Sequence, residues 1–194
     1  MDREQALALF RKTEALLEGH FLLTSGLHSP QYFQCAKVLQ YTDYMEKLCQ
    51  PIAEFFAQSA IDCVISPAIG GIVVGQEVAR QLSCRSIFAE RENSIMTLRR
   101  GFELKAGERV IAVEDVVTTG GSIKEVIELA KKAGVEVLGA AFIVDRSGGT
   151  VGFDVPTYAV LEMEVITYSP DQCPLCRQGL SLVKPGSRKM VQQT

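Results

Sequence analysis

The sequence lacks any long apolar run free of charge. No stretch of its 194 residues supplies the about 20 consecutive apolar residues that a membrane-spanning helix needs. Acid and base stand together within the first four residues, and no uninterrupted apolar stretch follows them, which excludes a secretory signal peptide. These absences predict a soluble, cytoplasmic protein with no membrane partner.

Concentrated positive charge is also missing. The chain has 20 Lys and Arg against 23 Asp and Glu, a formal net charge of -3, and no block of like charge. A protein that binds a nucleic-acid backbone or an anionic membrane needs a concentrated basic face. We therefore expect no nucleic acid among the partners, although a local basic loop remains compatible with the composition.

Cysteines are too few and too scattered for a disulfide scaffold. Of the 6 cysteines, four lie within apolar patterns, where a free thiol behaves as a small hydrophobic group. Only Cys173 and Cys176 form a spaced pair, which is half of a zinc site, and neither His20 nor His28 stands at a spacing that completes it. Two packed thiols in a turn are the preferred interpretation; zinc shared across a dimer axis and a redox pair remain open.

Apolar periodicity predicts an α/β fold. We expect an N-terminal helix over 3–17, two short strands or an extended hood over 20–38, and a helix from 43 to 56 in which Pro51 marks a kink or a boundary. Short apolar strands at 63–66, 86–89, 109–113 and 135–144 then alternate with helices at 72–82 and 122–133, with a further possible strand at 102–104. Such alternation indicates a mostly parallel sheet flanked by helices, with the site at the carboxyl ends of the strands.

One domain spans the whole chain in this interpretation. Its expected parts are an N-terminal helix and hood (1–40), a parallel-sheet core (60–165), a mobile loop or hairpin (90–108) and an irregular tail (168–194).

The most informative run is VIAVEDVVTTGGSI, residues 110–123. Glu114 and Asp115 stand where the buried strand is expected to end. Two adjacent charges at a buried strand tip are costly unless sugar hydroxyls, a cation or protein donors bind them. This pair is therefore a candidate binding site.

A hydroxyl- and glycine-rich loop follows and runs into a helix. Thr118 to Ser122 read Thr-Thr-Gly-Gly-Ser, and free N–H groups at a helix N-terminus suit a phosphate monoester. Ser122 and Glu125 also match a capping box. The loop lacks the lysine of GxxxxGK[ST] and the spacing of GxGxxG, which disfavours nucleoside-triphosphate hydrolysis and dinucleotide binding.

Two acids followed by Thr-Thr-Gly-Gly-Ser resemble the phosphoribosyl pyrophosphate signature of type I phosphoribosyltransferases. The resemblance implies that fold, with acids on the ribose hydroxyls and the loop on the 5′-phosphate. The residues it implies for phosphoribosyl pyrophosphate are Ile69, Gly70, Arg91, Glu114, Asp115, Val116, Val117, Thr118, Thr119, Gly120, Gly121 and Ser122.

The segment 21–34, with Ser-Gly, Ser-Pro and Tyr-Phe pairs, is similar to the hood of orotate phosphoribosyltransferases, a hood built from N-terminal and C-terminal segments. Arg146, after the strand at 135–144, matches the arginine that pairs with orotate in that family, and a guanidinium fork suits a planar anion. Without that match, a surface ion pair would be the preferred role of Arg146. The residues implied for orotate are Thr118, Arg146, Tyr32 and Phe33.

The chain departs from the family pattern at three places. Gly70 and Thr24 stand where many orotate enzymes carry lysine, and the loop 91–101 lacks their Lys-x-His-Gly pattern. The loop carries Arg91, Arg99 and Arg100 instead, which we expect to neutralise pyrophosphate. For Arg99 and Arg100, a solvated hairpin end is the alternative.

The resemblance implies transfer of phosphoribose from phosphoribosyl pyrophosphate to orotate, through an oxocarbenium-like transition state. Mg²⁺ is the implied cofactor, bound mainly through the substrate, with no protein side chain assigned as its ligand. The implied catalytic residues are Asp115, Glu114, Arg99 and Arg100. A homodimer, in which the loop reaches the neighbouring site, is also implied.

Two other functions remain open at this point. One is transfer of phosphoribose to a purine base. The other is a non-catalytic nucleotide-sensing regulator of the same fold, which would bind RNA or DNA and needs a basic face.

Overall fold

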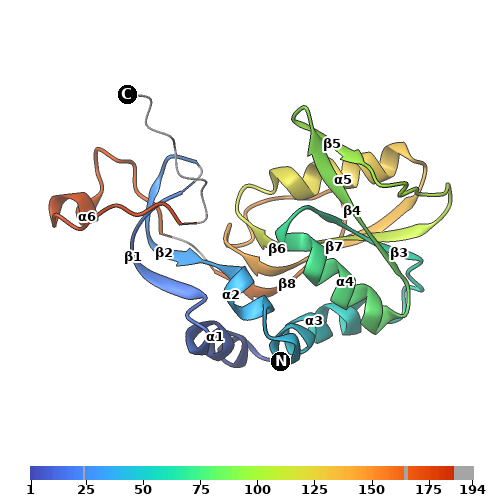
Figure 1. Cartoon of the computed structure of the whole chain (residues 1–194), viewed down its shortest axis with the longest axis horizontal. Coiled ribbons are helices and arrows are strands. Elements are labelled where there is room, and N and C mark those ends of the chain that lie inside the picture. Colours follow the sequence, from blue (N-terminus) through green and yellow to red (C-terminus); the bar gives the residue numbers. More distant parts are fainter. Residues whose placement is uncertain (24, 164–165, 186–194) are drawn as a thin grey trace.

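A computed structural model describes residues 1–23, 25–163 and 166–185; Thr24 and the end of the tail, 186–194, lie outside this part. A six-stranded sheet forms its centre, in the order β5-β4-β3-β6-β7-β8 (Figure 1). All neighbouring strands are parallel except β5, which is antiparallel to β4. The strands are β3 (Cys63–Pro67), β4 (Arg85–Glu92), β5 (Ile95–Leu98), β6 (Arg109–Val117), β7 (Glu136–Asp145) and β8 (Thr157–Glu162). The expected mostly parallel α/β sheet is confirmed.

Helices cover both faces of this sheet. Side chains alternate along β6, so that Ile111 faces one hydrophobic cluster and Val110 and Ala112 face the other. The first cluster packs α1 (Arg3–Lys12), α2 (Cys35–Leu39), α3 (Thr42–Phe56) and α4 (Gly70–Leu82), and the second packs α5 (Gly121–Lys132). Among the described residues, no helix is both long and apolar enough to cross a bilayer.

A small hood stands beside the sheet and combines a segment from the N-terminal part of the chain with one from the C-terminal part (Figure 1). It consists of the antiparallel strands β1 (Leu16–Leu22) and β2 (His28–Phe33) and of residues 166–185, which include α6 (Pro174–Arg177). Tyr168 exchanges two backbone hydrogen bonds with His28, and Val183 bonds to the backbone on both sides of Phe21. The expected hood of N-terminal and C-terminal segments is confirmed.

Two element predictions were wrong. The first helix ends at Lys12 rather than at residue 17, because Glu14 takes a positive φ of 52° and turns the chain into β1. No strand forms at 102–104; Phe102 instead packs edge-on against Phe88, with ring centroids 5.0 Å apart. Pro51 lies inside α3 without ending it, and β8 was not foreseen.

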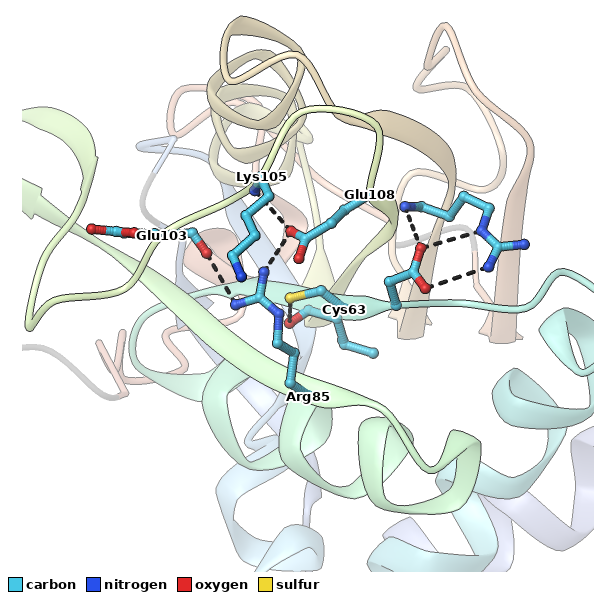
Figure 2. Close-up of polar contacts among 8 residues, drawn as sticks. Cys63, Arg85, Glu103, Lys105 and Glu108 are labelled. Carbon is cyan, nitrogen blue, oxygen red and sulfur yellow. Dashed lines mark hydrogen bonds and ion pairs between the residues drawn. The ribbon is translucent and has the colours of Figure 1, made fainter.

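The segment after β5 is tied to the start of β4 (Figure 2). The Arg85 guanidinium donates to the Glu103 carbonyl at 3.0 Å and forms an ion pair with Glu108, which also accepts the Lys105 N–H at 2.9 Å. Residues 103–108 are therefore anchored at the edge of the sheet. The β4–β5 hairpin turns at Asn93 and Ser94; Met96 is buried against the core, whereas Ile95 is exposed.

Candidate active site

The two acidic residues lie inside a strand rather than after it. β6 continues to Val117 because its ladder with β7 extends past the last residue that β3 pairs, as far as Val117 and Asp145. Neighbouring side chains of a strand point to opposite faces. Asp115 accordingly lines a cavity under the hood, and Glu114 does not.

This cavity has a volume of about 820 Å³ and lies between the hood and the carboxyl ends of β3, β6 and β7. Its walls combine an acid, an arginine, two threonine hydroxyls and aromatic rings. The residues that line it are Leu23, Ser25, Tyr32, Phe33, Gln34, Cys35, Ala36, Ile69, Gly70, Asp115, Val116, Thr118, Thr119 and Arg146.

Burial disfavours the ionised form of both carboxyl groups. Removal from water and the neighbouring Asp115 raise the pKa of Glu114 to about 8, against a smaller opposing effect of Arg91. Burial also raises the pKa of Asp115, although backbone N–H groups partly offset this. Neither acid forms an ion pair with any residue that the structure describes. A ligand that brings positive charge or hydroxyl donors would therefore be favoured here.

Gly70 begins α4 against Asp115. A Cβ built at Gly70 would overlap the Asp115 carboxylate. The absence of a side chain at Gly70 therefore lets the loop before α4 close directly over the acid. A lysine at this position does not fit this arrangement.

The loop from Thr118 to Gly121 leads into α5 with free backbone donors. Gly120 is the N-cap, with a φ of 74° that favours glycine, and the N–H groups of Thr119, Gly120 and Gly121 donate no hydrogen bond within the described residues. The capping box was wrong: α5 has no side-chain cap, and Glu125 pairs with Arg91 at 2.7 Å instead. The loop is thus free to bind an anion.

The Arg146 guanidinium is buried and has no hydrogen-bond partner among the described residues. Its residue is only 7% exposed, and its Nε and Nη2 atoms donate to no described group. Its guanidinium lies 5.8 Å from the Tyr32 ring centroid and 6.0 Å from that of Phe33, and burial lowers its pKa. An unsatisfied guanidinium on a cavity wall is costly, which indicates a site for a planar anion.

The three loop arginines lie outside the cavity, on or beside the β4–β5 hairpin. Arg100 forms two hydrogen bonds with Glu90, Arg99 pairs with Glu92 at 3.4 Å, and Arg91 pairs with Glu125. The loop 93–101 contains no acid, but β4 and α5 supply the partners. None of the three arginines faces the cavity of its own chain.

The structure thus brings together all four residues expected for orotate and six of the twelve expected for phosphoribosyl pyrophosphate. The six are Ile69, Gly70, Asp115, Val116, Thr118 and Thr119. Val117 is buried in the core, and Gly120, Gly121 and Ser122 lie just beyond the lining residues. Sequence reasoning did not assign Leu23, Ser25, Gln34, Cys35 and Ala36 to the site, and their only signal was their position in or next to the hood segment.

Comparison with known proteins shows the family to which the chain belongs. Residues 38–173 match the model of the phosphoribosyl transferase domain family. An orotate phosphoribosyltransferase of Pelotomaculum thermopropionicum is 57% identical over 190 residues, which cover 98% of this chain and 100% of that protein. One from Caldicellulosiruptor saccharolyticus is 55% identical over 190 residues, with the same coverage.

A solved structure extends this similarity to the fold. The crystal structure of orotate phosphoribosyltransferase from Aeropyrum pernix matches with a TM-score of 0.70 and 27% identity, over 81% of this chain and 93% of that one. The match to the domain model, and relatives more than half identical over nearly the full length, place this chain in the orotate phosphoribosyltransferase family.

Proposed function

We propose that this chain transfers the 5-phosphoribosyl group from phosphoribosyl pyrophosphate to orotate, giving orotidine 5′-phosphate and pyrophosphate in pyrimidine synthesis. The observation that carries the proposal is the unpartnered Arg146 guanidinium on the wall of a cavity that also contains Asp115 and Thr118. Orotate offers a carboxylate and carbonyl oxygens in one plane, which a guanidinium fork binds with two hydrogen bonds. Tyr32 and Phe33 flank that guanidinium.

Phosphoribose binding is assigned to the turn between β6 and α5. The free N–H groups and hydroxyls of Thr118 to Gly121 would hold the 5′-phosphate at the positive end of the α5 dipole. Asp115, which lines the cavity, would accept hydrogen bonds from the ribose hydroxyls. Glu114 lies on the other face of β6 and does not line the cavity, so no direct contact with the ribose is assigned to it.

The residues present fit Mg²⁺ as the cofactor. Asp115 offers a carboxylate on the cavity wall that no described cation pairs with, and Mg²⁺ binds proteins through one or two carboxylates together with substrate phosphates. When bound, Mg²⁺ would supply positive charge to the departing pyrophosphate. Asp115 would hold it through oxygen, directly or through a water molecule.

Catalysis would then depend on position and charge. Among the described residues that line the cavity, neither Ser25 nor Cys35 donates a hydrogen bond to a base, and burial raises the pKa of the Cys35 thiol, so we infer direct displacement rather than a covalent intermediate. Asp115 would stabilise the positive charge that grows on the ribose ring, and Arg146 would orient the base for attack. The hood, through Leu23 and Ser25, would exclude water from the activated ribose.

We further infer a homodimer in which the β4–β5 hairpin serves the neighbouring site. Arg99 and Arg100 do not line the cavity of their own chain, and Ile95 at the start of β5 is 68% exposed. Pyrophosphate could displace Glu90 and Glu92 as the partner of these arginines. A second copy of the chain is the partner that this arrangement favours.

The test is loss of orotate absorbance when purified protein receives phosphoribosyl pyrophosphate and Mg²⁺, with adenine, hypoxanthine and uracil assayed in parallel for product formation. We expect rapid turnover of orotate alone. Arg3→Gln serves as a surface control that should leave orotate turnover unchanged, because Arg3 is exposed at the start of α1 and does not line the cavity. Turnover of a purine instead of orotate would overturn the proposal, as would no turnover of any base.

A further inference from the structure

Four metal-binding side chains meet in the hood, away from the active-site cavity. His20 comes from β1, His28 from the start of β2, and Cys173 and Cys176 from the first turn of α6. One atom of each, two imidazole nitrogens and two thiol sulfurs, lies within 4.8 Å of every other. The spacing of the two histidines gave no sign of this, because the folded hood brings together residues about 150 positions apart.

The separations match those of a tetrahedral zinc centre. Bonds of about 2.0–2.1 Å to nitrogen and 2.3 Å to sulfur place neighbouring N and S ligands about 3.5 Å apart, and two nitrogens about 3.3 Å apart. His20 Nε2 lies 3.5 Å from Cys173 Sγ and 3.7 Å from Cys176 Sγ, and His28 Nδ1 lies 3.3 Å from Cys176 Sγ. The two nitrogens are 2.9 Å apart, and the two remaining separations, His28 to Cys173 and Cys173 to Cys176, are no longer than 4.8 Å, so shifts of about 1 Å or less would complete the geometry.

The surroundings hold His20 in the form that binds a metal. Its Nδ1 lies 2.8 Å from the Leu180 carbonyl, which only accepts, so Nδ1 carries the proton and Nε2 presents its lone pair to the cluster. A backbone carbonyl in this role is a common outer partner of metal-binding histidines. His20, His28 and Cys173 are buried, and only Cys176 reaches the surface.

Simpler explanations account for only part of the cluster. A hydrogen bond from His28 Nδ1 to His20 Nε2 would satisfy the two imidazoles, but it does not explain why both thiols lie next to them. A disulfide between Cys173 and Cys176 would use the thiols and leave the two imidazoles facing it. A single ion explains all four positions and their geometry together.

We propose that the hood binds one Zn²⁺ through His20 Nε2, His28 Nδ1, Cys173 Sγ and Cys176 Sγ. Four protein ligands fill the tetrahedron and leave no position for a substrate or water, so the site is structural. On binding, two thiols lose their protons and become thiolates, two neutral imidazoles donate lone pairs, and the bound site carries no net charge. No oxidation or reduction takes place.

The ion would fasten the C-terminal segment to the β1–β2 hairpin. Backbone hydrogen bonds of Val183 and Tyr168 already connect the C-terminal segment to the same hairpin. The hairpin carries Tyr32 and Phe33, and Leu23 and Ser25 lie in its turn; all four line the cavity. Zinc would therefore set the position of the cavity roof without contacting the substrates.

The experiment measures metal in the purified full-length chain by plasma mass spectrometry, after growth with zinc and dialysis against a weak chelator. We expect one zinc per chain, and a loss of at least ten-fold in Cys173→Ser, Cys176→Ser, His20→Gln and His28→Gln. Cys84→Ser is the matched control, because Cys84 is partly exposed and lies outside the hood, and it should keep its zinc. Free-thiol titration of the native protein should show no disulfide.

Two measurements on the unmodified sequence avoid variants that fail to fold. Co²⁺ exchanged for zinc should give the visible absorption of a tetrahedral site with thiolate ligands, and X-ray absorption of the zinc protein should resolve two sulfur and two nitrogen ligands. Absence of stoichiometric metal after reconstitution, or a native Cys173–Cys176 disulfide, would overturn the site. If X-ray absorption showed four sulfur ligands and both histidine variants kept the metal, the proposed site would be wrong. The metal would then be bound by the cysteine pairs of two copies of the chain.

Discussion

The Asp115 carboxylate occupies the space that a side chain at Gly70 would need. The two residues belong to different elements, the N-terminus of α4 and the strand β6, and their contact joins the loop before α4 to the proposed ribose site. Any side chain at Gly70 must displace either the loop or the acid.

We therefore expect Gly70→Ala to lower kcat/KM for phosphoribosyl pyrophosphate by at least about ten-fold, since a displacement of 1 Å at a reacting group can cost far more than that. Steady-state kinetics at saturating orotate measure the effect. Gly152→Ala is the matched control, because a Cβ at Gly152 meets nothing within 4 Å. Equal kinetics for the two variants would show that Asp115 can move without consequence.

We expect the buried Arg146 guanidinium to favour orotate binding and to lower the stability of the substrate-free protein. Arg146→Lys keeps the charge but loses the planar guanidinium, and Arg146→Gln loses both. Hydrogen bonds to a charged group are worth about 1.5–3 kcal/mol each. We therefore expect the KM for orotate to rise about 10-fold to 100-fold in these variants. The same Gln variant removes a buried, unpaired cation and should raise the Tm of the substrate-free protein. Kinetics and thermal unfolding of the same preparations test both parts. An unchanged KM together with a lower Tm would contradict this role for Arg146.

The raised pKa of Glu114 predicts that the free energy of unfolding depends on pH. Its pKa is raised in the folded protein to about 8 from 4.5, so the folded state holds a proton that the unfolded state releases over this window. Its contribution to stability is fully present below pH 4.5 and is lost as pH rises through about 8, at up to about 1.4 kcal/mol per pH unit. Denaturant unfolding at several pH values should show a shallower decline in Glu114→Gln than in the unmodified chain. Parallel declines would exclude Glu114 as the source.

Mixed dimers test where the hairpin arginines act. An Asp115→Asn chain and an Arg99→Ala, Arg100→Ala chain should each be nearly inactive alone. If the hairpin serves the neighbouring site, mixing them under conditions of subunit exchange restores one complete site in each mixed dimer, or up to roughly a quarter of full activity. No recovery, with exchange verified by tagged subunits, would place the arginines in their own chain's site.

The sequence predicted the sheet and the binding loop because both depend on local patterns. Short apolar strands such as 109–113, and the glycines that open α5, carry their structure in neighbouring residues. The hood segment and Arg146 were found through resemblance to a family rather than through periodicity. Arg146 and part of the hood segment line the cavity in the structure.

The errors came from pairing between distant segments. The length of β6 depends on β7, so the sequence alone could not show that Asp115 and Glu114 lie within a strand and face opposite sides. The acids that neutralise the loop arginines stand on β4 and α5, outside the loop that was considered. The four-residue cluster of the hood likewise forms only when the two ends of the chain meet.

The contact between residues 166–185 and the β1–β2 hairpin also sets an order for biosynthesis. Every strand of the central sheet leaves the ribosome before Tyr168 and Val183, so the nascent chain can complete its sheet while the hairpin made first still lacks its neighbours. The segments that are translated first and last must then pack together. A chain released early, after the sheet but before α6, would fold its core and remain without a finished roof.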